Sequence, residues 1–155
     1  MINPDIIIYT DGSSRGNPGP GGYGVVMQKF GTNYVKEFSE GYRKTTNNRM
    51  ELLAVIVALE KIKKKKQFVH IYTDSKYVSE SVEKKWVISW EKTGFKNKKN
   101  SDLWIRFLEI YRKHNVSFFW IKGHNNHPIN EKCDKLAFNA CSKDKLLIDK
   151  DYERQ

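Results

Sequence analysis

One helical segment constrains the fold of this 155-residue chain more than any other. Met50–Ile62 carries an unbroken apolar run from Leu52 to Leu59, and Glu51 is its only charge before Glu60. A helix that is apolar all round must be buried on most of its sides. The cations of Lys63–Lys66 then follow, and cations are favourable at a helix C-terminus. Any fold of this chain has to surround that helix.

Strand-like and helical segments alternate along the rest of the chain. The expected strands are Asp5–Asp11, Tyr23–Phe30, Tyr34–Gly41, Phe68–Asp74 and Val116–Ile121. The other expected helices are Ser75–Glu83, Asp102–His114 and Asn130–Ser142. The glycine-dense segment Gly12–Gly24 is expected to be a loop. This order predicts an α/β fold with a five-stranded mixed sheet, in which three antiparallel strands are followed by parallel additions and helices flank the sheet.

The length suits one domain, which we place at residues 1–142. Residues 143–155 are charged, and we expect them to form a frayed tail. No apolar run approaches the ~20 residues that span a bilayer, and the N-terminus has no features of a secretory signal. Cys133 and Cys141 would lie about 12 Å apart on a helix, too far for a disulfide. We therefore expect a cytoplasmic protein with reduced thiols and no membrane association.

The charge points to a polyanionic partner. Lys and Arg number 28 against 18 Asp and Glu, which gives a formal net charge of +10. Such an excess is typical of proteins that bind nucleic acid. The alternative is a lysine-rich composition with no functional meaning.

Four carboxylates could converge. Asp11 and Asp74 each end an apolar strand, and parallel neighbours would bring both to one edge of the sheet. Glu51 and Asp134 lie on two of the expected helices. Singly, each has a structural explanation: a turn residue, a helix-dipole partner or the rim of an apolar stripe. Together they would repel one another unless cations neutralise them, and oxygen ligands suit Mg²⁺ or Mn²⁺.

Four motifs in order resemble the bacterial type 1 ribonuclease H family and cover roughly residues 5–142. They are Tyr9-Thr10-Asp11-Gly12-Ser13 with the glycines up to Gly24, Thr45-Thr46-Asn47-Asn48-Arg49-Met50-Glu51-Leu52, Tyr72-Thr73-Asp74-Ser75, and Trp120-Ile121-Lys122-Gly123-His124 with Asn130-Glu131-Lys132-Cys133-Asp134. The resemblance implies a monomeric endonuclease that cuts the RNA strand of an RNA–DNA hybrid and leaves 5′-phosphate and 3′-hydroxyl ends. It implies Mg²⁺ as cofactor, with two ions when substrate is bound and Mn²⁺ as a substitute.

The resemblance also assigns roles in catalysis. It makes Asp11, Glu51, Asp74 and Asp134 the metal ligands. It makes His124 a mobile residue that assists proton transfer or product release, although an ordinary loop histidine is the alternative. His70 and His114 are interpreted as structural.

By the same resemblance, Asn17 approaches the RNA backbone, and Asn47 and Asn48 reach the minor groove of the hybrid. The alternative for the two neighbouring asparagines is helix capping. A DNA phosphate remote from the cut would be held by Lys44, Thr46 and Asn100.

The basic stretch Lys84–Lys99 matches the family's DNA-gripping protrusion. Trp86 and Trp90 lie four residues apart and share a helix face, and basic residues interleaved with aromatics suggest a nucleic-acid platform. The alternative is a solvated surface helix. Tyr77 is expected to wall the DNA channel, whereas Trp104 and Trp120 are expected in the core.

The chain departs from the family at two places. Asn126 stands where many relatives have glycine, and the protrusion at Thr93–Ser101 is shorter than in well-known relatives.

Two other functions remain open from the residues alone. One is a non-catalytic nucleic-acid-binding module, which should have lost a carboxylate. The other is a different nuclease of the wider superfamily, against which the Asn-Asn-Arg-Met-Glu and Lys-Gly-His motifs argue.

Overall fold

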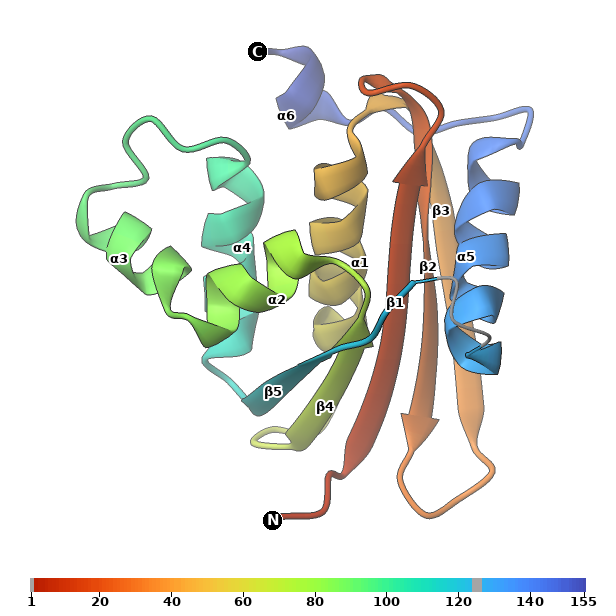
Figure 1. The fold of residues 1–155 in the computed structure, drawn as a ribbon, viewed down its shortest axis with the longest axis vertical. Coiled ribbons are helices and arrows are strands. Elements are labelled where there is room, and N and C mark those ends of the chain that lie inside the picture. The colour runs from red at the N-terminus through yellow and green to blue at the C-terminus, as the bar shows by residue number, and fades with distance from the viewer. Residues whose placement is uncertain (1, 124–126) are drawn as a thin grey trace.

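The fold is a five-stranded mixed sheet with helices on both faces, as the sequence predicts (Figure 1). The computed structural model describes residues 2–123 and 127–155. The strands are β1 (Ile6–Ser14), β2 (Gly19–Lys29), β3 (Val35–Thr45), β4 (Phe68–Thr73) and β5 (Asn115–Trp120), in the spatial order β3-β2-β1-β4-β5. The first three strands pair antiparallel, and β4 and β5 are added parallel to β1.

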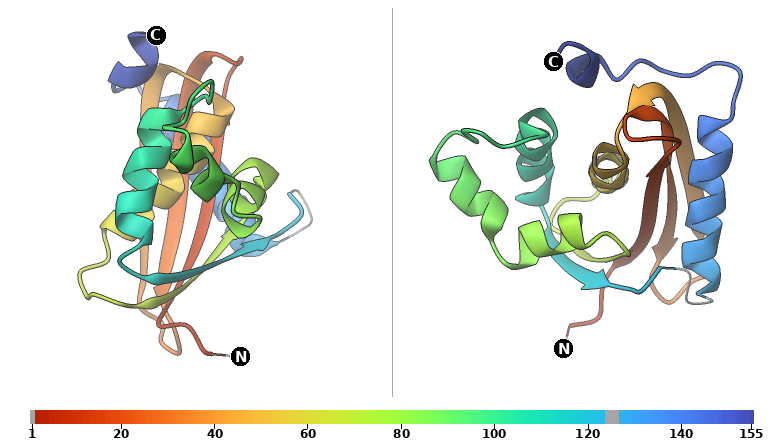
Figure 2. Two further views of the ribbon diagram at one scale, coloured as in Figure 1. Left: turned by 90° about the vertical axis from the view of Figure 1, so that its left-hand side faces the viewer. Right: turned by 45° about the horizontal axis from the view of Figure 1, so that its top comes forward.

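The helices divide between the two faces of the sheet. They are α1 (Asn47–Glu60), α2 (Lys76–Glu83), α3 (Trp86–Lys92), α4 (Ser101–Tyr111), α5 (Pro128–Cys141) and the short α6 (Lys150–Glu153). Helix α5 covers β1, β2 and β3 from one side, and α1 packs on the other side against β1, β2 and α4 (Figures 1 and 2). No helix in the described ranges is long and apolar enough to cross a membrane.

Helix α1 is the centre of the core. Its fully buried residues include Leu52, Ala54, Val55 and Ile56. The helix packs against β1 and β2 of the sheet and against α4 and α2. Full burial of an aliphatic side chain contributes about 1.5–3 kcal/mol, so this helix is a major source of stability. Thr46 begins the helix as its N-cap and accepts a hydrogen bond from the backbone N–H of Arg49.

The glycine-dense segment is not the loop that the sequence predicts. Most of Gly12–Gly24 belongs to β1 and β2, and only residues 15–18 lie between the strands. A Cβ on Gly12 would lie 2.4 Å from the backbone nitrogen of Glu51 in α1, and one on Gly24 would lie 2.3 Å from the carbonyl oxygen of Cys133 in α5. These glycines let two helices approach the strands from opposite faces.

The C-terminal segment also differs from the expected frayed tail. The backbone of Leu147 donates to the carbonyl of Gly41 and accepts from the N–H of Arg43, both at 2.9 Å, which extends pairing along β3. Asp149 is buried, and Glu153 forms a 2.8 Å ion pair with Arg43. Two of the charges that suggested solvation, Asp149 and Glu153, are instead paired with arginines of the domain.

Candidate active site

Three carboxylates meet at one edge of the sheet. Asp11 in β1, Glu51 in α1 and Asp74 directly after β4 each offer an oxygen, and these oxygens all lie within 4.8 Å of one another. The strand pairing places two of them: Ile8 faces Ile71 and Thr10 faces Thr73 in the parallel register. The parallel register therefore brings Asp11, within β1, beside Asp74, which directly follows β4. Both lie toward the carboxyl ends of their strands, where open α/β sheets bind ligands.

Local contacts fix the side chains of this acidic triad of Asp11, Glu51 and Asp74. The backbone N–H of Gly12 donates to Glu51 Oε1 at 2.6 Å, which ties α1 to β1 beside Asp11. A Cβ on Gly123 would lie 2.7 Å from Asp74 Oδ2, so only glycine leaves room for that carboxylate. The backbone at Gly12 and Gly123 thus lies directly against the triad.

The surroundings of the triad disfavour the ionised form of two of its carboxyl groups, those of Asp11 and Glu51. Burial, followed by the nearby Asp74 and Asp134, raises the pKa of Asp11 to about 8. Burial and the charges of Asp11 and Asp74 raise the pKa of Glu51 well above its usual value, although the Gly12 N–H opposes the shift. An all-oxygen set of crowded acids fits a hard divalent cation such as Mg²⁺ or Mn²⁺, whose charge would offset the repulsion.

Asp134 lies next to this triad, but it is not part of the group whose carboxylate oxygens all lie within 4.8 Å of one another. It projects from α5, which packs on the opposite face of the sheet from α1, and a hydrogen bond between its carboxyl and that of Asp11 helps to raise the Asp11 pKa. His124, the predicted proton-transfer residue, lies outside the described residues, as does Asn126.

Trp120 is not a core residue, contrary to the sequence prediction. Its side chain is 45% exposed at the end of β5, and Lys76 Nζ lies 4.7 Å from its ring centroid. Its indole N–H donates to the carbonyl oxygen of Asp74 at 2.9 Å. Among the described residues β5 is an edge strand of the sheet, so its side chains have strand neighbours on one side only. Trp104, by contrast, is fully buried as expected.

The predicted RNA-side residues gather around the start of α1. Asn17, in the turn between β1 and β2, accepts a hydrogen bond from the backbone N–H of Asn47 at 3.0 Å. Asn47 and Asn48 are exposed in the first turn. Because Thr46 is the N-cap, the capping alternative for Asn47 and Asn48 is wrong.

The three residues expected to hold a DNA phosphate lie at the end of β3 and directly before α4. Lys44 and Thr46 flank Thr45 at the end of β3, and Asn100 precedes α4 in a left-handed conformation. The Asn100 amide donates to the Tyr77 hydroxyl at 3.0 Å. The hydroxyl of Tyr77 also accepts from the Trp104 indole at 2.9 Å, so it holds Asn100 against the core.

The two tryptophans of the basic stretch differ in their surroundings. Trp86 is 43% exposed, with Lys84 Nζ 5.3 Å from its ring centroid. Trp90 packs edge-on against Trp104 at 5.9 Å and carries Lys98 over its other side at 5.1 Å. Trp90 therefore braces the protrusion on the core, whereas Trp86 offers a ring to solvent.

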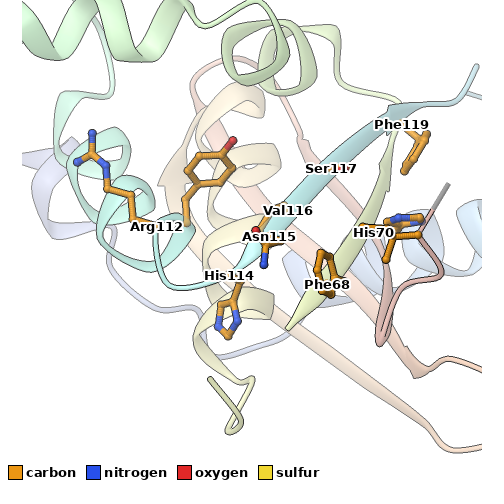
Figure 3. Close-up of a pocket in the computed structure, with 10 residues that line it drawn as sticks. Phe68, His70, Arg112, His114, Asn115, Val116, Ser117 and Phe119 are labelled. Atoms are coloured by element: carbon orange, nitrogen blue, oxygen red, sulfur yellow. The ribbon is translucent and has the colours of Figure 1, made fainter. Parts of the chain in front are cut away.

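A separate hollow of about 490 Å³ lies along β4 and β5, away from the triad (Figure 3). His70 and His114, the two histidines expected to be structural, line this hollow. His114 Nδ1 accepts from the backbone N–H of Gln67 at 3.1 Å, and His70 packs on Phe119 with ring centroids 4.9 Å apart. Both contacts fit a structural role.

Sequence reasoning missed one ion cluster beside the phosphate residues. Arg49 is 1% exposed and lies between Asp149, which follows the expected domain boundary, and Asp102 of α4. An arginine directly before an apolar helical run was the available signal, since a buried cation needs partners.

Known proteins share this architecture and sequence. The sequence model of the RNase H family matches residues 3–142. Ribonuclease H of Desulforamulus reducens is 53% identical over 150 residues, covering 94% of this chain and 92% of that protein, and Ribonuclease H of Lachnoclostridium phytofermentans is 46% identical over 153 residues, covering 93% and 96%. Among solved structures, LC9-RNase H1, a type 1 RNase H with the type 2 active-site motif, superposes with a TM-score of 0.81 at 31% identity, covering 92% of this chain and 74% of that one. LC11-RNase H1 in complex with RNA/DNA hybrid gives 0.67 at 28% identity, covering 88% and 96%. The chain therefore belongs to the bacterial ribonuclease H family of enzymes.

Proposed function

We propose that this enzyme hydrolyses the RNA strand of RNA–DNA hybrids in a divalent-metal-dependent reaction and leaves 5′-phosphate and 3′-hydroxyl ends. The acidic triad carries the proposal, because three carboxylate oxygens within 4.8 Å of one another form a site for hard cations. Family membership supplies the reaction class, and the relative solved with an RNA/DNA hybrid supports the substrate.

Asp11, Glu51 and Asp74 would hold Mg²⁺, with Asp134 as the fourth ligand when two ions are present with substrate. Mn²⁺ offers similar chemistry to the same oxygens. When bound, the ions would supply activation of the attacking water and neutralisation of charge on the departing 3′-oxygen. The protein's own part is positioning: Gly12 orients Glu51, and the Trp120 indole holds the backbone that carries Asp74.

The substrate would lie across the start of α1. Asn17, Asn47 and Asn48 are exposed, and a hydrogen bond joins Asn17 to the backbone of Asn47, which suits a shared contact with the RNA strand. Contacts with 2′-hydroxyl groups are how a protein distinguishes RNA from DNA. Lys44, Thr46 and Asn100 would bind a phosphate of the DNA strand. Tyr77, Trp86 and Trp90 would line the DNA channel with the neighbouring lysines.

His124 is proposed to move a proton or to assist product release. An imidazole titrates near pH 6.5 when unperturbed, which suits proton transfer at neutral pH. The sequence places it between β5 and α5, the two elements that carry Trp120 and Asp134.

We further propose that the enzyme acts as a monomer in the cytoplasm. The triad is assembled from a single chain, so catalysis needs no second copy. Light scattering during size-exclusion chromatography measures the oligomeric state.

The decisive experiment compares cleavage of labelled RNA–DNA hybrid, duplex RNA and duplex DNA with and without Mg²⁺. We expect Mg²⁺-dependent cleavage of the RNA in the hybrid only, with products that accept a 3′-end label directly. Cleavage of duplex DNA at a similar rate would favour another nuclease of the superfamily. Binding of hybrid without any cleavage would favour the non-catalytic module.

A further inference from the structure

Asp149 is a buried acid that joins the C-terminal segment to the domain. Its side chain is 9% exposed, and its Oδ2 accepts from the Thr45 hydroxyl at 2.8 Å. The same oxygen accepts from Arg49 Nε at 2.7 Å, and its Oδ1 accepts from Arg49 Nη2 at 2.9 Å. A buried carboxylate with this many donors is fixed in position, and so are its partners.

Arg49 extends this arrangement to α4. Its guanidinium binds Asp102 through Nη1 at 2.9 Å and Nη2 at 2.7 Å, and its Nη1 also reaches Asn100 Oδ1 at 3.4 Å. The ring of Tyr152 from α6 lies 5.7 Å from the guanidinium carbon. Planar bidentate pairing on two sides leaves the arginine a single orientation.

These contacts surround the three residues proposed to bind the DNA phosphate. Lys44 and Thr46 are the chain neighbours of Thr45, which donates to Asp149. Asn100 contacts Arg49 and lies two residues before Asp102. Each of the three is therefore one peptide unit or one side-chain contact away from a group bound by Asp149 or Arg49.

We propose that Asp149 is a positioning residue for the DNA-phosphate contact, acting through Arg49 and Thr45 on Lys44, Thr46 and Asn100. This inference rests on the proposed function, because it needs a nucleic-acid phosphate to be held at these residues. It places a determinant of substrate binding in the C-terminal segment, beyond residue 142, where the match to the family sequence model ends.

Loss of Asp149 has a defined physical consequence. Arg49 keeps Asp102, which is 25% exposed, but loses the partner that ties it to β3 and the C-terminal segment. Asn100 and the end of β3 then no longer share a rigid support. The triad oxygens are not among the contacts of Asp149, so binding should weaken while the chemical step is retained.

The test is a double-mutant cycle with Asp149→Ala and Asn100→Ala, in which KM and kcat are measured for hybrid cleavage and Kd is measured by anisotropy in EDTA. Asp144→Ala, which removes an exposed acid from the same segment, is the matched control. Thermal melting of each variant sets an assay temperature at which all are folded, and Asp149→Asn serves as a milder change if Asp149→Ala does not fold.

We expect Asp149→Ala to raise KM and Kd about fivefold, the value of about one hydrogen bond, with kcat nearly unchanged. In the Asn100→Ala background the same change should have a smaller effect, since one of the three contacts it supports is already gone. An unchanged Kd would show that Asp149 only stabilises the fold, and an equal factor in both backgrounds would refute the route through Arg49 to Asn100. If the Kd values follow the expected cycle but the parent enzyme does not cleave the hybrid, the proposed function is refuted and the positioning role stands.

Discussion

Neutralising Asp11 should make the metal-free protein more stable while it abolishes cleavage. Asp11 is 6% exposed and faces the other carboxylates of the triad, so its charged form is disfavoured in the folded state. Asp11→Asn keeps the size of the side chain and removes the charge. The prediction follows from crowding of like charges in a site that is built for a cation.

The size of the effect depends on pH in a defined direction. The unfolded chain releases the Asp11 proton near its ordinary pKa of 3.8, whereas the folded protein holds it up to a pKa of about 8. The contribution of this carboxyl to stability is therefore full below pH 3.8 and is lost as the pH rises towards 8. The variant does not titrate at this position, so its advantage should grow across that window and level off above it.

At pH 7 the gain in the free energy of unfolding from Asp11→Asn has a ceiling of about 4 kcal/mol. This is the difference between pH 7 and the ordinary pKa of Asp11, multiplied by about 1.4 kcal/mol per pH unit. Glu51 and Asp134 share the same repulsion, so we expect a gain of about 2–4 kcal/mol in the free energy of unfolding. In a domain of this size that corresponds to a rise in Tm of about 5–15 °C.

Thermal melting in EDTA at several pH values measures this gain, with Asp144→Asn as the control for removal of an exposed charge. Added Mg²⁺ should stabilise the parent enzyme and reduce the difference, because a bound ion offsets the repulsion. A variant no more stable than the parent at pH 8, or a gain that does not change with pH, would refute the electrostatic reasoning.

Three further variants test the remaining parts of the site. Asp74→Asn should abolish most cleavage but leave hybrid binding intact, since phosphate contacts dominate affinity; single-turnover cleavage and anisotropy measure the two, and near-normal turnover would exclude Asp74 as a ligand. Replacing Lys96, Lys98 and Lys99 with alanine should raise KM and lower the log–log salt slope of binding by up to ~2.7, at about 0.9 per phosphate contact, whereas an unchanged slope would mean a solvated face. His124→Ala should lower kcat roughly 10²-fold with little change in affinity. A loss in steady-state turnover alone would assign His124 to product release, a loss in single turnover as well would assign it to the chemical step, and no loss would make it incidental.

The sheet and the triad could be predicted because their signals are local. Two apolar runs that each lead to an aspartate predict both acids at one edge once right-handed crossovers make the two strands parallel, and an acid inside an apolar helix has few other places to lie. The glycine-dense segment could not be recognised as strand, because glycine is depleted in strands. Glycine is needed in these strands because the backbones of α1 and α5 approach Gly12 and Gly24 too closely for a side chain.

Two other features depended on contacts that the sequence does not encode locally. Phe118 is buried, and alternation along β5 would place Trp120 on the same inward side, but β5 is an edge strand among the described residues and the ring is 45% exposed. Asp149 and Arg49 are 100 residues apart. Nothing near either residue indicates that they pair, so the charged C-terminal segment resembled a solvated tail.

The near-identical segments Ile8–Thr10 of β1 and Ile71–Thr73 of β4 carry a hazard for folding. Ile8, Tyr9 and Thr10 pair with Ile71, Tyr72 and Thr73, so like lies beside like across the two strands. A slip of two residues would preserve the alternation of inward and outward side chains, yet it would displace one aspartate by about 6.6 Å along the strand. Such a species would be compact, nearly native in its core and catalytically dead. The hydrogen bond from Gly12 to Glu51 forms only when β1 sits correctly against α1, so it penalises a slip of β1 and couples the placement of that strand to a competent enzyme.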